Sequence, residues 1–150
     1  MPRTRSRKRG WLHYHSLSIV SVLLLAVWII AYRLSDPETH LGAFFGNAIA
    51  DWSGSVVIIL GTKYLYEQGS AESRSVTKGK GNSVWDLLRC HSLLIFLAVT
   101  GVGWLILYLR MAPGGKWGQV VGNIVSEWLQ MAGLVYLTKS LIERGSKESR

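Results

Sequence analysis

The chain has 150 residues, the length of one domain, but it is 49% hydrophobic and carries a formal net charge of +8. A soluble domain with so much charge is rarely so apolar, so the apolar and basic residues must occupy different parts of the chain. Lysine and arginine do cluster, in 3–9, 74–89 and 139–150, and the runs between these clusters are long enough to cross a hydrocarbon core of about 30 Å. This segregation indicates an integral membrane protein and argues against a nucleic-acid partner.

The first apolar run follows a basic segment, 1–14, and predicts a helix over about 15–34. A basic segment followed by an apolar run is also typical of a secretory signal peptide. No small-x-small cleavage motif follows this run, and a similar helix recurs later in the chain. We therefore predict a retained helix.

Three further apolar runs predict helices over about 41–64, 91–110 and 117–139, because each is long enough to cross a bilayer. The single cysteine, Cys90, excludes a disulfide within the chain, and no Cys/His spacing resembles a zinc site. The predicted fold is an all-α integral membrane protein with four transmembrane helices.

The connections between these helices are polar. Residues 36–39 and 113–115 contain Pro or Gly and suit tight turns. Residues 75–88 begin with a stretch rich in Lys, Gly and Ser, which predicts a flexible linker, and end in a short interfacial turn around 84–88.

The distribution of basic residues predicts the orientation, because Lys and Arg that flank spans remain in the cytoplasm. Of the 17 basic residues, the two short loops hold only Arg33, Arg110 and Lys116. Most of the others lie before the first helix, in the linker or after the last helix. Both termini and the linker are therefore expected in the cytoplasm, and the expected location is the plasma (inner) membrane.

The two halves of the chain resemble each other. A shift of 76 positions (91 − 15) lays 13–74 on 89–150 without a gap, and about 21 of 62 aligned positions are identical. Self-similarity at a fixed spacing indicates duplication, here of a hairpin over 15–74 and another over 89–150. Because each copy has two spans, both enter the membrane in the same direction, which predicts a tandem parallel (2+2) repeat about a pseudo-two-fold axis along the membrane normal.

An acidic residue lies near the middle of the second helix of each copy. Asn47 and Asp51 are four residues apart and share one helix face, and Asn123 and Glu127 repeat the pattern. An ionisable side chain at mid-membrane costs roughly 2.5–3.5 kcal/mol, so it suggests a functional site. Because no lysine or arginine lies at this depth, we expect the pair to carry a proton or bind a cation. The competing interpretation is that each acid is a protonated hydrogen-bonding group that joins helices.

Small residues recur every four positions in the same two helices. Such a ridge lets two backbones approach closely, which favours helix packing within the chain or between chains. The ridge consists of Gly42, Gly46 and Ala50, repeated as Gly118, Gly122 and Ser126.

Polar residues at the cytoplasmic ends of the helices also repeat. His15 and His91 begin the first helix of each copy, where two histidines across an axis could ligate a haem iron. An interfacial hydrogen bond or a proton relay explains them without a cofactor, so we predict no cofactor and no metal.

The segments after the second helices match more closely than the spans do. They contain Lys63 and Glu67, repeated as Lys139 and Glu143. A repeated polar segment indicates a fixed local structure or a partner. The alternative is an ordinary helix end with a glycine stop at Gly69 and its counterpart.

The chain has no nucleotide-binding loop and no nucleophile with a positioned base, so enzyme activity is not expected. One predicted function is an oligomeric transporter or channel that handles protons or cations through the two acids. The alternative is a non-catalytic scaffold or accessory subunit of a larger membrane complex. Under either hypothesis the partners are the lipid bilayer and further copies or other subunits.

Overall fold

A computed structural model describes residues 11–73, 84–112 and 114–141, which form helices joined by short connections. Parts of the predicted basic segment and linker, and Glu143, lie outside these residues. The helices are α1 (Trp11–Tyr14), α2 (Ser16–Leu34), α3 (His40–Tyr64), α4 (Val84–Cys90), α5 (Ser92–Arg110) and α6 (Lys116–Ser140).

The four predicted spans are confirmed as helices that are long and apolar enough to cross a membrane. Their bounds agree with the predicted ones to within one residue at each end. The turn expected around 84–88 is the short helix α4. The chain is therefore a multi-pass membrane protein.

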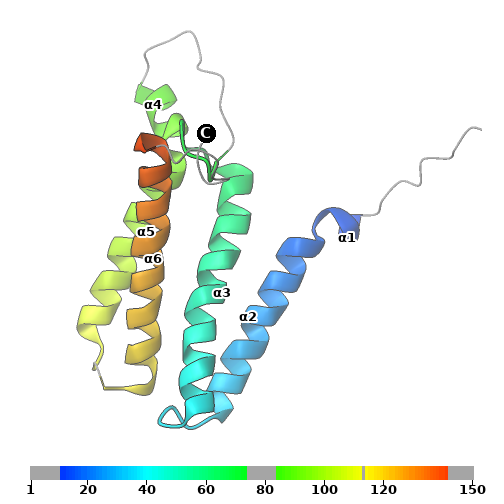
Figure 1. Ribbon diagram of the computed structural model, residues 1–150, viewed down its shortest axis with the longest axis vertical. Helices are drawn as coiled ribbons and strands as arrows, with labels where there is room; N and C mark the ends of the chain where they lie inside the picture. The colour runs from blue at the N-terminus through cyan, green and yellow to red at the C-terminus, as the bar shows by residue number, and fades with distance from the viewer. Residues whose placement is uncertain (1–10, 74–83, 113, 142–150) are drawn as a thin grey trace, which may run out of the picture.

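The two long helical hairpins lie side by side (Figure 1). Helices α3 and α6 pack against each other in the centre and run in the same direction, while α2 flanks α3 and α5 flanks α6. We call the end where 35–39 join α2 to α3 the loop end. The opposite end, where α3 ends and α4 lies, is the linker end.

The central helix α3 has well-defined limits. The Thr39 hydroxyl caps its start by accepting a hydrogen bond from the Gly42 N–H at 3.1 Å. The helix ends at Tyr64, because Leu65 adopts extended backbone. The alternative of a glycine stop at Gly69 is not supported, because α3 ends five residues earlier (69 − 64). Gly69 lies in the connection that follows the helix, with a φ of 90° that favours glycine.

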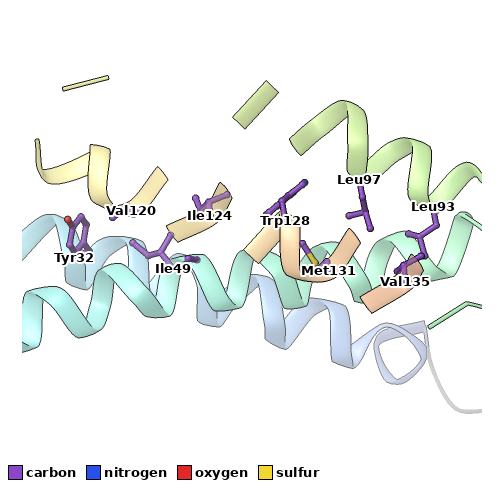
Figure 2. Close-up of a cluster of buried hydrophobic side chains, with 10 residues drawn as sticks. Tyr32, Ile49, Leu93, Leu97, Val120, Ile124, Trp128, Met131 and Val135 are labelled. Carbon is purple, nitrogen blue, oxygen red and sulfur yellow. The ribbon is translucent and has the colours of Figure 1, made fainter. Parts of the chain in front are cut away.

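A continuous apolar core runs along the contact between α3 and α6 (Figure 2). Near the loop end Tyr32 packs with Val120, and near the linker end Leu93 and Leu97 of α5 pack toward Val135. Many other apolar side chains on α2 and α5 are exposed, as expected for helices that face lipid. The core therefore holds the two central helices together and fixes the position of their polar residues.

Candidate functional site

The two predicted acids meet between the central helices. Asp51 and Glu127 each lie eleven residues beyond the first residue of their helix (51 − 40 and 127 − 116). At 1.5 Å per residue this is about 16 Å along helices that are about 37 Å long. The Asp51 and Glu127 carboxyl groups lie close to each other across the contact between α3 and α6.

Glu127 also lies against the backbone of α3. A methyl group added at Gly54 would lie only 3.3 Å from Glu127 Oε2 and 3.5 Å from Met131 Sδ. Gly54, one turn from Asp51, therefore provides the space that the Glu127 carboxyl occupies.

The two predicted amides form a second contact one turn closer to the loop end. Asn123 Nδ2 donates to Asn47 Oδ1 at 2.5 Å. Both amides line a small cavity of about 50 Å³. Asn123 also lines a larger open cleft of about 450 Å³ with Tyr108, Gln119 and Gly122. A polar surface thus extends from the acid pair toward the loop end.

The polar stripe formed by Asn47, Asp51, Asn123 and Glu127 is not enclosed by the chain. The side chains of Asn47 and Asp51 are exposed, and those of Asn123 and Glu127 are half-buried. Near it, Trp128 is 5% exposed and donates from Nε1 to Thr100 Oγ1 at 2.9 Å. The stripe therefore has one side packed on the core and one side open to whatever surrounds the chain.

The small residues of the predicted ridge make different kinds of contact. A methyl group at Gly42 would lie 1.9 Å from the Asp36 carbonyl oxygen, so Gly42 meets a loop backbone and not a helix. A methyl group at Gly46 would lie 3.1 Å from the Tyr32 ring, and one at Gly122 would lie 3.0 Å from the Tyr108 ring. These two glycines lie where a hairpin's helices approach each other.

The remaining residues of the predicted ridge differ in burial between α3 and α6. Ala50 is buried, with 1% of its surface exposed. Gly118 is buried as well, whereas Ser126 is exposed.

A second polar cluster lies at the linker end around Glu67, which is fully buried. His91 Nδ1 lies 2.5 Å from Glu67 Oε1, and Lys139 Nζ donates to the same oxygen at 3.0 Å. The other carboxylate oxygen accepts from the Leu94 N–H at 3.4 Å. A buried carboxylate needs such partners, because its desolvation otherwise costs several kcal/mol.

The segment that carries Glu67 is fixed on α4 and α5. Tyr66 O accepts from the Leu93 N–H at 3.0 Å, and the Gln68 N–H donates to Cys90 O at 2.8 Å. Ser70 Oγ lies 3.0 Å from Thr138 Oγ1 on α6. The hydrogen bonds of the segment over 65–73 therefore connect one hairpin to the other.

His15 and Lys63, the other predicted histidine and lysine, are also in contact. Lys63 Nζ lies 3.2 Å from His15 Nδ1. The last residue predicted for this end, Glu143, lies outside the described residues.

Residue spacing does not predict the contacts of two further polar residues at the loop end. The Tyr32 hydroxyl donates to Lys116 O at 2.5 Å, although the ring is buried against α3 and α6. Lys116 Nζ donates to the carbonyl oxygens of Arg33 and Ser35 at the end of α2. A lysine there stabilises carbonyls that a helix end leaves unpaired. These bonds join the two hairpins at the loop end.

The described residues thus define a multi-pass membrane protein with polar centres at the middle and at the linker end of its central helices. Within these residues, no three His, Cys, Asp or Glu side chains are placed to hold a metal ion. A scan of protein-family models found no matching family, and searches of curated proteins and of solved structures found no matching protein.

Proposed function

We propose that this protein is a small membrane transporter or channel in which Asp51 and Glu127 bind a proton or a cation, and that it acts as an oligomer. The observation that supports the proposal is the meeting of the two acids at the middle of the two central helices. Two ionised carboxylates this close repel each other, and an apolar environment strengthens the repulsion. A shared proton or a bound cation removes the repulsion.

The exposure of the stripe supports an oligomer. Asp51 is exposed midway along a candidate membrane span, and lipid tails provide no hydrogen-bonding partner for it. Ionisable residues within spans face a neighbouring helix or a water-filled space. A further copy of the chain against the open side of α3 and α6 would meet this requirement and would enclose a polar path beside Asn47 and Asn123.

Two features of the topology belong to the same proposal. The bounds of α5 and α6 lie 76 residues beyond those of α2 and α3 (92 − 16 and 116 − 40), which supports a parallel repeat about a pseudo-two-fold axis between the central helices. The charge distribution supports a cytoplasmic linker end in the plasma (inner) membrane.

The test is flux through liposomes that contain the purified protein. An imposed proton or potassium gradient should collapse faster than in empty liposomes, and Asp51→Asn and Glu127→Gln should each lower the flux by at least an order of magnitude. Glu38→Gln makes the same acid-to-amide change at an exposed position near the loop end and should leave the flux unchanged. The transport proposal is wrong if the wild-type protein dissipates neither gradient.

The alternative function is a scaffold or accessory subunit of a larger membrane complex. The observation that favours it is α4, whose Val84, Trp85 and Leu87 are 70%, 79% and 62% exposed at the linker end. An exposed apolar helix next to a fixed polar segment is a suitable docking surface for another protein subunit. Absence of flux, together with co-purification of a defined membrane protein that Trp85→Ala releases, would support this function.

A further inference from the structure

The open cleft of about 450 Å³ lies beside the two helices of the second hairpin, near the loop end. It is lined by Tyr108 of α5 and by Gln119, Gly122 and Asn123 of α6. Gln119 and Asn123 lie three and seven residues beyond Lys116, the first residue of α6 (119 − 116 and 123 − 116). At 1.5 Å per residue this is about 4–10 Å along the helix. The cleft therefore extends from the loop end into the candidate membrane span.

Two polar groups that line the cleft make no hydrogen bond with any residue that the structure describes. They are the Tyr108 hydroxyl and the Gln119 side-chain amide. In the first hairpin the counterpart of Tyr108 is Tyr32, and its hydroxyl donates to Lys116 O. Lipid tails provide no partner for a hydroxyl or an amide. Water suits both groups, because it can donate to them and accept from them.

The cleft leads toward the acid pair. Asn123 lines the cleft and donates from Nδ2 to Asn47 Oδ1. Glu127 follows Asn123 by four residues, so it lies on the same face of α6, one turn further from the loop end. The Asp51 carboxyl lies close to that of Glu127. About one helical turn therefore separates the inner end of the cleft from the two acids.

The chemistry of the cleft favours a hydrated cation. The described residues that line it are uncharged, and their amide and hydroxyl oxygens can replace part of the water around an alkali cation. The two acids one turn away attract cations and repel anions. A water molecule occupies about 30 Å³ in the liquid, so the cleft has room for a cation with its first shell of water.

We propose that this cleft is a water-filled entrance through which a hydrated alkali cation passes from the loop end to Asp51 and Glu127. The inference rests on the proposed function and deepens it, because it names the class of ion and the route by which the ion reaches the acids. Tyr108 and Gln119 contact the ion first, and Asn123 contacts it next.

The rate at which introduced cysteines react tests the proposal, because a thiol reacts as the thiolate and stays protonated when lipid surrounds it. The protein is placed in lipid nanodiscs in a Cys90→Ala background. Gln119→Cys and Asn123→Cys should react with a methanethiosulfonate that carries a trimethylammonium group. Their matched controls are Ile106→Cys and Val102→Cys, at exposed positions of α5 that lie four and eight residues from its end (110 − 106 and 110 − 102) and do not line the cleft.

Each cleft cysteine should react at least an order of magnitude faster than its control. A reaction at position 123 as slow as that at position 102 would overturn the proposal. If Asn123→Cys does not fold, the comparison of positions 119 and 106 decides in the same way. Nanodiscs expose both sides of the bilayer, so the result does not depend on the orientation of the chain.

The charge preference of the cleft is measured with the sulfonate-bearing form of the same reagent. The ratio of the cationic to the anionic reaction rate at positions 119 and 123 should be several times the ratio at Gly114→Cys, an exposed loop position. Equal ratios would overturn the assignment of a cation. Flux without fast reaction in the cleft would overturn this proposal alone. Fast, cation-selective reaction without flux would support the entrance and overturn only the proposed transport.

Discussion

Glu67 shows how a single residue connects the two hairpins. Its carboxylate is fully buried, whereas the side chains of His91 and Lys139 remain 27% and 33% exposed. Solvent therefore screens the charges of His91 and Lys139 more than the charge of Glu67. The contribution of the cluster to stability depends mainly on the pairing of the buried Glu67 carboxylate. An acid at this position costs energy unless both cations contact it.

Glu67→Gln should therefore destabilise the protein. Glutamine keeps the shape of the side chain but loses the charge that His91 and Lys139 contact, at a cost of about 1.5–3 kcal/mol for charged hydrogen bonds. The thermal unfolding midpoint in detergent should fall. Glu38→Gln, at an exposed loop position, should change the stability by less than about 0.5 kcal/mol. Equal midpoints for Glu67→Gln and the wild-type protein would show that the cluster contributes no charge interaction.

The helices themselves could be predicted from the sequence, but their partners could not. Each span is a predominantly apolar run with flanking polar residues, so its length and bounds depend mainly on local composition. The contacts of Glu67 join residues 24 and 72 positions away. Such contacts depend on helix tilt and on the course of the connecting segment, which residue spacing does not determine.

The two tyrosines illustrate the same limit. Tyr32 and Tyr108 occupy equivalent positions in the aligned halves. Tyr32 nevertheless donates to Lys116 O, whereas Tyr108 lines the open cleft beside Asn123. The proximity of Asp51 and Glu127 is easier to predict from the sequence, because both acids occupy the same face and depth of equivalent helices.

At the scale of the helices, the absence of a side chain at Gly42 should be essential for the stability of the fold. A methyl group there would lie 1.9 Å from the Asp36 carbonyl oxygen and 2.9 Å from Pro37 Cα, and backbone atoms cannot move away as a side chain can. Gly42→Ala should cost about 1–3 kcal/mol or more, as expected for overpacking. The measurement is again the unfolding midpoint in detergent.

The matched control for this substitution is Gly103→Ala. Gly103 also lies within a helix, α5, but a methyl group added there would meet no atom within 4 Å. Alanine in open space favours a helix over glycine, so this variant should be neutral or slightly stabilising. A similar loss of stability in both variants would show that the close approach at Gly42 is not the cause.

At the scale of the whole molecule, the proposed parallel repeat predicts where the loops lie. Because each hairpin has two spans, both short connections should lie on one side of the membrane, and α4 should lie on the other. The charge distribution predicts that the loops lie on the external side. Loops on opposite sides would require an odd number of spans between them, so loop accessibility tests whether both α3 and α5 cross the membrane.

Labelling of single cysteines in a Cys90→Ala background measures this directly. Thr39→Cys and Gly114→Cys occupy exposed positions near the loop end, and Trp85→Cys replaces a side chain on α4 that is 79% exposed. In intact cells a membrane-impermeant maleimide should label the two loop positions but not position 85. After permeabilisation it should label all three. Labelling of only one loop in intact cells would contradict the parallel repeat, and labelling of position 85 alone would reverse the orientation while keeping the repeat.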